Sequence, residues 1–270
     1  MRTRHIFPII AFVFVAVSWP VHVHAQSLGL APAQVVEKFK PGVPFEFDLT
    51  TANSGDAPVE MSVEITDFWY NDKGEKTFGA PGTSPRSAAN WIQFVPERFD
   101  VAAHGSQKMR AIVTPPTDAK GGYYAVLFVK SKPQLSFDKT KDGKSVFTNM
   151  RIGCLVLLSA ENTEDVKIDV SDLKLTPPST NHSLELSFMI ENQGNTHVFP
   201  LPRLAILDAN HKLVAKAESD MKRYLPGQKE PMHVDWSGTL DPGNYTVVLT
   251  ISYGEDRIET KTVPLVIAAK

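Results

Sequence analysis

Few side chains in this sequence have the types and spacing that catalysis or metal binding requires. Five histidines follow the first 25 residues, and none has a second histidine at a metal-ligand spacing such as His-x-x-x-His. We expect all five at the surface or in turns, as isolated polar residues usually are: His104, His182, His197, His211 and His233. The sequence also has no Gly-x-Ser-x-Gly elbow, no glycine-rich phosphate loop and no paired cysteine motif. We therefore predict a protein with no catalytic residues, no metal and no cofactor.

The only cysteine is Cys154, so no intrachain disulfide can form. It lies in Met150–Leu158, where every even-numbered residue is apolar. Because a free cysteine usually behaves as a small buried hydrophobe, we interpret Cys154 as a packed residue rather than a reactive thiol. The fold must then be stabilised by hydrophobic packing without a covalent cross-link.

The first 25 residues have the organisation of a secretory signal peptide. Two arginines precede the apolar run Ile6–Val17, and Val23 and Ala25 occupy the −3 and −1 positions of a cleavage site. That run is shorter than the roughly 20 residues that a membrane-spanning helix needs. We therefore expect a mature chain that begins near Gln26, has no membrane span and is exported, with the bacterial periplasm as the favoured compartment.

The charges of the chain are nearly balanced. Lysine and arginine total 28 and aspartate and glutamate total 30, which gives a formal net charge of −2. Proteins that bind nucleic acids or anionic membranes usually carry a basic surface. The composition therefore gives no reason to expect either partner.

Two stretches of the sequence repeat one pattern that is typical of β-sandwiches. Each has an alternating strand that ends at an Asn-x-Gly turn, Asn53–Gly55 and Asn192–Gly194. Each later has a strand that opens on tyrosine after glycine, in Gly121–Val129 and Leu240–Ile251. The turn residues before Tyr245 fit a tyrosine corner, in which the phenol bonds to backbone upstream. We predict an all-β chain with two tandem immunoglobulin-like sandwiches.

The expected organisation is a signal peptide at 1–25, a first sandwich at 27–161 and a second at 166–270, joined by the linker Glu161–Asp165. Ser131–Ser145 is polar and is predicted to be a long connection. The strands expected in the first sandwich are Val35–Phe39, Val43–Asn53, Val59–Tyr70, Trp91–Phe94, Gln107–Val113, Tyr123–Lys130 and Val146–Leu158. Those expected in the second are Val166–Leu175, Ser183–Glu191, Arg203–Asp208, Lys212–Ala217, Met232–Trp236, Asn244–Tyr253 and Arg257–Ile267.

The order of these features resembles that of the PapD-like periplasmic pilus chaperones. The shared features are a signal peptide, two immunoglobulin-like domains, no disulfide, and a long loop before the last strand of the first domain. The segments that carry the resemblance are Phe39–Asn53, Pro96, Gln107–Pro115, Gly122–Phe128 and Asn149–Leu158.

The resemblance implies a non-enzymatic chaperone that binds a protein subunit with an exposed or incomplete β-sheet edge. In such chaperones, the last strand of the first domain lends alternate apolar side chains to the subunit, and an exposed strand edge is a template for another chain. The candidate partner-binding residues are Val146, Thr148, Met150, Arg151, Ile152 and Cys154. The alternation alone leaves open whether this row, which continues to Leu158, packs the domain's own core instead.

The chain departs from the family at two positions. Family members hold the subunit's terminal carboxylate with two basic residues, one on the first strand and one on the last strand of the first domain. Here the first position falls on Val36 or Glu37, and the second on Gly153, with Arg151 nearby. A carboxylate in a partly dry cleft needs a fixed cation or several N–H donors. The sequence thus leaves open whether a carboxylate is bound.

Two other functions remain compatible with the sequence. A secreted structural or adhesive protein could use the sandwiches to hold a binding loop, for which Phe78–Trp91 is the candidate. A hydrolase whose site is scattered beyond recognition is the third. Of the three functions, we favour the chaperone-like one. The other two stay open because a shared fold alone does not fix function.

Overall fold

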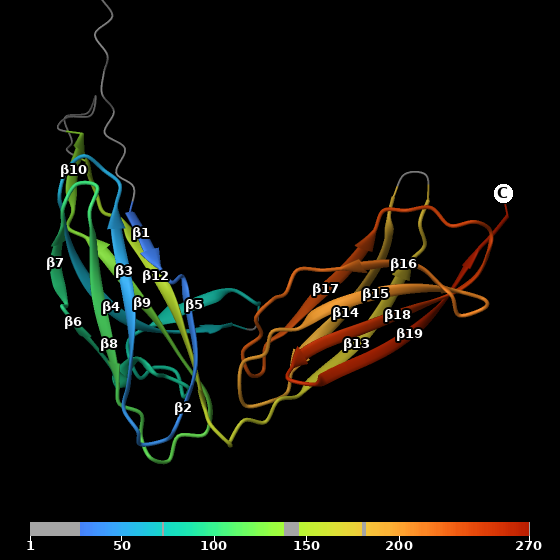
Figure 1. Ribbon diagram of the computed structural model, residues 1–270, viewed down its shortest axis with the longest axis horizontal. Coiled ribbons are helices and arrows are strands. Elements are labelled where there is room, and N and C mark those ends of the chain that lie inside the picture. Colours follow the sequence, from blue (N-terminus) through green and yellow to red (C-terminus); the bar gives the residue numbers. More distant parts are fainter. Residues whose placement is uncertain (1–27, 72, 138–145, 180–181, 270) are drawn as a thin grey trace, which may run out of the picture.

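The computed structural model describes residues 28–71, 73–137, 146–179 and 182–269. It contains two β-sandwiches that meet at an angle and enclose a concave side (Figure 1). The predicted all-β fold with two sandwiches is confirmed. The described residues form no helix that is long and apolar enough to cross a membrane. The predicted signal peptide lies outside the described residues.

The first sandwich consists of two facing sheets. One sheet has the strand order β1 (Leu28–Ala31), β3 (Phe45–Asn53), β8 (Ser106–Val113) and β6 (Ile92–Val95). The other has the order β2 (Gln34–Phe39), β12 (Arg151–Ala160), β9 (Gly121–Ser131), β4 (Val59–Tyr70) and β5 (Lys76–Gly79), with β7 (Arg98–Val101) also paired to β4. A separate pair is formed by β10 (Gln134–Phe137) and β11 (Val146–Thr148), and a short 3-10 helix, η1, spans Ala89–Trp91.

The second sandwich has a three-stranded and a four-stranded sheet. The three-stranded sheet has the order β13 (Ile168–Thr176), β14 (Leu184–Asn192) and β17 (Lys229–Trp236). The four-stranded sheet has the order β16 (Leu213–Glu218), β15 (Leu201–Asp208), β18 (Gly243–Gly254) and β19 (Arg257–Ile267). Each sandwich encloses its own apolar core, as the alternation of buried and exposed residues along the strands requires.

The two Asn-x-Gly turns that the sequence repeats are built alike. In the first, the Asn53 amide donates to the Ala57 carbonyl at 2.8 Å and accepts from the Gly55 N–H at 2.9 Å. In the second, the Asn192 amide donates to the Thr196 carbonyl at 2.8 Å and accepts from the Gly194 N–H at 2.9 Å. Both asparagines are buried. The repeated motif is therefore a repeated structure.

The predicted tyrosine corner is also confirmed. The Tyr245 hydroxyl donates to the Asp241 carbonyl, four residues upstream, at 2.9 Å. Such a bond fixes the entry of β18 into its sheet.

Several predicted strand bounds need correction. Strand β3 begins only at Phe45, and Val43 is 51% exposed instead of inward-facing. The predicted connection Ser131–Ser145 contains β10, whose backbone pairs with β11, while residues 138–145 of that connection lie outside the described part. The predicted single strand Val146–Leu158 is two strands, because the chain leaves the ladder between Thr148 and Arg151. The short strands β1, β5 and β7 were not predicted, since four-residue strands give little alternation to detect.

Candidate partner-binding edge

Strand β12 is paired along its whole length on one side and along half of its length on the other. It pairs with β9 from Arg151 to Ala160. On its second side it pairs with β2 only from Leu155 onward, where the Leu155 N–H donates to the Ala33 carbonyl at 3.1 Å. The preceding strand β1 pairs with β3 in the other sheet. Within the described residues, Arg151–Cys154 therefore lacks a strand partner on this side, and we call this segment the open edge.

The open edge exposes backbone groups in a fixed pattern. Backbone N–H groups alternate between the two sides of a strand with a period of two residues. Since the Leu155 N–H points toward β2, the N–H groups of Gly153 and Arg151 point to the same side, where β2 no longer runs. These are the groups that an added strand would engage.

The apolar row of β12 divides at Cys154. Cys154, Val156 and Leu158 are fully buried in the core of the first sandwich. This confirms Cys154 as a packed residue, and it corrects the prediction that its side chain faces a partner, because the core already encloses it. Ile152 and Met150 are only half-buried and belong to none of the three buried apolar clusters. The apolar side chains of this row that the core leaves partly uncovered are therefore Ile152, within the open edge, and Met150, just before it.

Strand β11 adds an exposed aromatic residue that the sequence analysis missed. Its register places Thr148 opposite Gln134, Phe147 opposite Leu135 and the backbone of Val146 opposite Phe137. Thr148 is exposed, and Phe147 is 64% exposed. Counting only even-numbered positions across the break between β11 and β12 left Phe147 out of the candidate row.

The Phe128 ring explains why an arginine stands at position 151 and a glycine at position 153. The Arg151 guanidinium lies 3.4 Å from the centre of the Phe128 ring and 3.4 Å from a Glu64 carboxylate oxygen. A Cβ atom at Gly153 would lie 2.8 Å from Cε1 of the same Phe128 ring. The ring thus occupies the space that a side chain at position 153 would need. No basic side chain fits there without displacing Phe128.

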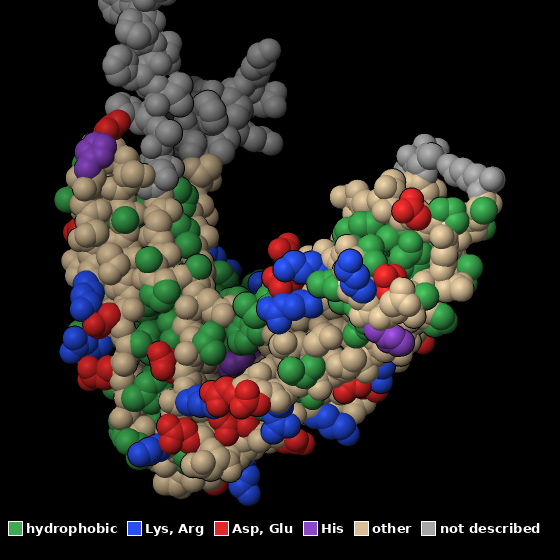
Figure 2. All heavy atoms as spheres, turned by 45° about the vertical axis from the view of Figure 1, so that its right-hand side comes forward, with side chains coloured by type: hydrophobic (Ala, Val, Ile, Leu, Met, Phe, Trp, Pro, Cys, Tyr) green, Lys and Arg blue, Asp and Glu red, His purple; other side chains and the backbone are tan. Residues whose placement is uncertain are grey.

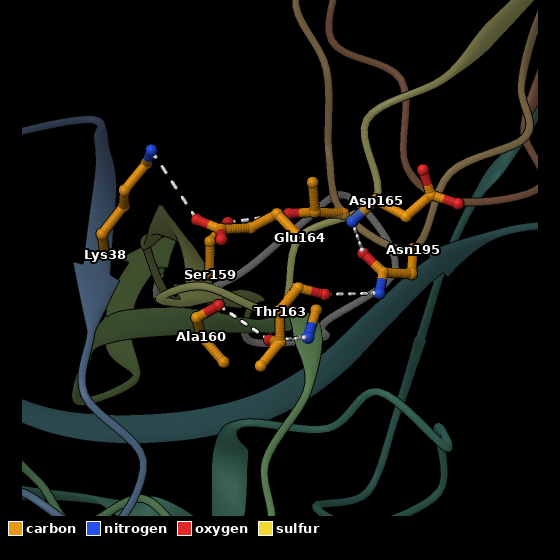
Figure 3. A network of polar contacts seen from close by, with 9 residues as sticks. Lys38, Ser159, Ala160, Thr163, Glu164, Asp165 and Asn195 are labelled. Carbon is orange, nitrogen blue, oxygen red and sulfur yellow. Dashed lines mark hydrogen bonds and ion pairs between the residues drawn. The ribbon is translucent and has the colours of Figure 1, made fainter.

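Asn195 fixes the connection between the two sandwiches (Figure 3). Its side chain donates to the Thr163 carbonyl at 2.8 Å and accepts from the Asp165 N–H at 2.7 Å, both in the linking segment. The backbone carbonyl of Asn195 accepts from the Gly122 N–H of β9 at 2.8 Å. Asn195 therefore bonds both to the first sandwich and to the segment that leads away from it.

Two side-chain contacts accompany this joint. Ser159 of β12 and Thr196 bond through their hydroxyls at 2.7 Å, and Lys38 of β2 lies 3.7 Å from Glu164 (Figure 3). Several independent contacts at one joint restrict the angle between the sandwiches, which positions the open edge relative to the second sandwich.

An apolar cluster fills the place where the sandwiches meet, which we call the elbow. Its buried members from the first sandwich are Phe68, Tyr124, Val126, Phe128 and Leu157, and Leu225 joins them from the second. Figure 2 shows hydrophobic side chains gathered where the two arms converge around the hollow. The sandwiches thus share a packed interface.

Arg223 crosses the elbow from the second sandwich. Its guanidinium donates to Gln34 of β2 at 2.6 Å and to the Tyr70 hydroxyl of β4 at 3.1 Å, and lies 5.9 Å from the Phe68 ring centre. This contact could not be predicted from the sequence, because Arg223 and Gln34 are 189 residues apart.

His197 lies in the connection between β14 and β15, as the prediction of surface or turn positions allows, but its surroundings differ from those of the other four histidines. His104, His182, His211 and His233 are exposed, but His197 stacks edge-on against Tyr124 and Phe199 in the elbow. Burial, with a smaller effect of the nearby Arg223 charge, lowers the pKa of His197 to about 4. His197 is therefore neutral at pH 7.

The lowered pKa of His197 predicts that the folded protein becomes less stable in acid. In the unfolded chain the pKa of this histidine is about 6.5, so the unfolded state binds the proton first as the pH falls. The free energy of unfolding therefore decreases by about 2 kcal/mol between pH 7 and pH 5. His197→Phe should remove that part of the pH dependence. Urea unfolding of both proteins at pH 7 and pH 5 measures it, and an unchanged difference between the two pH values would contradict the assignment.

The alternative binding loop Phe78–Trp91 is held against the first sandwich. The buried Asp67 carboxylate accepts from the Ser84 N–H at 2.7 Å and from the Ser87 hydroxyl at 2.5 Å. Part of the loop, Thr83–Arg86, lines an open cavity of about 660 Å³ together with residues 225–229 of the second sandwich. Within the described residues, no group of three or more His, Cys, Asp or Glu side chains could hold a metal ion.

No family model and no curated protein matches the sequence. Among solved structures, the class 5 fimbriae chaperone CfaA matches with a TM-score of 0.50 and 11% identity, over 88% of this chain and 100% of the other. A chain of the Salmonella enterica SafA pilin–SafB chaperone complex matches with a TM-score of 0.44 and 11% identity, over 88% and 97%. A chain of the Acinetobacter baumannii CsuC–CsuE chaperone–tip subunit complex matches with 0.42 and 11%, over 88% and 97%. At this identity the CfaA match establishes the fold alone: the chain has the two-domain architecture of the PapD-like pilus chaperones.

Proposed function

We propose that the protein is a non-enzymatic, exported chaperone or chaperone-like accessory protein that binds a pilus or surface subunit by β-strand pairing. The observation that carries the proposal is the open edge of β12, where Arg151 and Gly153 present backbone groups without a strand partner among the described residues. The half-buried Met150 and Ile152 and the exposed Phe147 supply apolar side chains beside it. An extended segment of a partner would complete the sheet and cover these side chains.

The fold shared with the fimbriae chaperone CfaA supports this proposal. SafB and CsuC are described as chaperones in complex with a pilin and with a tip subunit, respectively. A bound strand adjacent to β12 would also satisfy an edge that otherwise favours aggregation. The partner class is therefore a protein subunit with an exposed or incomplete β-sheet edge.

Hydrogen exchange in a complex tests this function at the level of single amides. The mature chain is purified from the periplasm with its bound subunit, and amide exchange is compared with that of the free chain. Arg151 and Gly153 should become protected, because their N–H groups face the added strand. Ile152 and Cys154 should change little, because their amides already face β9. Equal exchange of Arg151 and Gly153 in both samples would contradict strand pairing at this edge.

A further inference from the structure

We propose that two copies of this chain associate through the second sandwich, by packing the four-stranded sheet of one copy face to face on that of the other. The surface concerned is the side of the sheet β16–β15–β18–β19 that points away from the core, which we call the outer face (Figure 1). Its central residues lie on β18 and β19: Thr246, Val248, Thr250, Thr260, Thr262 and Pro264. The inference does not depend on the function proposed above, because the open edge belongs to the first sandwich.

The outer face carries no charge along its two longest strands. Val247, Leu249 and Ile251 of β18 are buried in the core, so the residues that alternate with them point outward. Each of these outward residues has an outward neighbour on β19. The three pairs are Thr246 with Pro264, Val248 with Thr262, and Thr250 with Thr260. All six side chains are uncharged.

The uncharged surface extends to both edges of the sheet. On β15, Leu207 lies beside Thr246 of β18 and opposite Leu213 of β16. Leu213 is 54% exposed, and Val266 near the end of β19 is 67% exposed. One row of the outer face therefore crosses all four strands without a charged residue.

The outward sides of two other sheets show that this composition is specific to the outer face. The outward side of β13–β14–β17 carries charges on each strand, among them Lys174, Glu185 and Asp235. On the first sandwich, Asp48 of β3 pairs with Arg110 of β8. A sheet face in contact with water normally carries such polar residues, whereas the centre of a protein interface is depleted in charge. The outer face thus has the composition of an interface.

A second copy of the chain is the partner that suits this composition. A two-fold axis brings a surface onto itself, so a self-pairing face must have no charge near its centre. Val248 lies at the centre, between Ala205 and Thr262. Toward one side of the face, Arg203 donates to Glu218 of the neighbouring strand at 2.6 Å. Because these opposite charges are adjacent, each can also meet the opposite charge of a second copy.

The edge strand β19 favours packing by the face over pairing by the edge. Pro264 has no N–H, and a proline in an edge strand interrupts the row of donors on the free side of that strand. A second copy therefore gains little by extending the sheet at β19. The face beside that edge has no such obstacle.

The size of the outer face sets the expected affinity. Over Asn244–Ser252, the four strands cover roughly 500 Å², given about 3.3 Å per residue and about 4.8 Å between strands. Stable interfaces bury about 800 Å² per partner, and weak ones bury less than about 600 Å². We therefore expect a weak dimer, with a dissociation constant on the order of 50 µM.

Sedimentation velocity of the mature chain tests the inference over concentrations that span about 50 µM. The wild-type chain should pass from monomer to dimer. Val248→Lys should raise the dissociation constant at least about tenfold, because the two-fold axis brings two lysines together. The control Met189→Lys changes a half-buried outward residue on the central strand of the other sheet and should have no effect. A wild-type chain that stays monomeric throughout would overturn the inference.

Oppositely charged variants show whether the face meets itself. Val248→Glu alone should also be monomeric, but an equimolar mixture with Val248→Lys should associate at least as tightly as the wild type, since opposite charges then meet across the axis. If each variant loses association and the mixture does not regain it, the outer face contacts a different surface and the inference is wrong. Thr262→Lys, at the exposed neighbour of Val248, repeats the test with less risk to the fold.

Ile152→Asp separates this dimer from pairing through the open edge. Ile152 lies on the first sandwich, so its substitution should leave self-association unchanged. If Ile152→Asp abolishes self-association while Val248→Lys does not, the copies pair through the open edge, and the outer face is not the interface.

Discussion

Ile152→Asp is expected to abolish binding of the partner subunit while the first sandwich stays folded. Ile152 is half-buried, lies on the open edge and belongs to none of the buried apolar clusters. A carboxylate there can reach water in the free protein but would be buried without a cation once a strand is added. Burying such a charge costs several kcal/mol, so we expect at least a hundredfold increase in the dissociation constant. Titration calorimetry with the purified subunit measures the affinity, and thermal unfolding measures the stability.

Two further variants separate a loss of binding from a loss of folding. Ile258→Asp, at a 60% exposed position of β19 in the second sandwich, should change neither affinity nor stability. Cys154→Asp should unfold the first sandwich, because Cys154 is fully buried in its core only two residues further along β12. If Ile152→Asp unfolds the protein as Cys154→Asp does, the whole row belongs to the core and the proposed function is contradicted.

The fold class was predictable because it depends on local patterns. Alternation with a period of two identifies half-buried strands in any sequence, and Asn53 and Asn192 mark the turns that close two of them. The bounds of β19 were predicted correctly, since Arg257 follows a clear turn. Local chemistry decides such features, so one sequence is enough to find them.

The candidate site was only partly predictable because it depends on how distant segments meet. Alternation placed Ile152 and Cys154 in one row, but it could not tell that β2 starts to pair only at Leu155. Alternation also does not continue across the break between β11 and β12, so counting every second residue did not include Phe147.

The elbow was still less accessible from the sequence. Arg223 reaches Gln34 only because the joint around Asn195 sets the angle between the sandwiches. No local pattern encodes that angle. The half-buried position of His197 has the same origin, since its neighbour Tyr124 belongs to the other sandwich.

Asn192→Ala is expected to destabilise the second sandwich by about 3 kcal/mol. The Asn192 amide donates to the Thr196 and Tyr224 carbonyls at 2.8 and 3.0 Å and accepts from the Gly194 N–H. Its side chain is fully buried, so water cannot replace these bonds after the substitution. The substitution removes three hydrogen bonds: the Thr196 carbonyl loses the Asn192 amide, while the Tyr224 carbonyl keeps the Val198 N–H and the Gly194 N–H keeps the Lys167 carbonyl. Urea unfolding monitored by circular dichroism measures the loss.

The repeated turn provides a matched test in the first sandwich. Asn53 makes bonds of the same kind, to the Ala57 and Ala102 carbonyls and from the Gly55 N–H, and it is equally buried. Asn53→Ala should therefore cost about as much as Asn192→Ala. Asn71 accepts from the Lys73 and Glu75 N–H groups at an exposed turn, where water can replace it, so Asn71→Ala should cost no more than about 1 kcal/mol. Equal losses for Asn71→Ala and the two buried variants would mean that turn geometry, and not burial of the bonded groups, explains why the motif occurs twice.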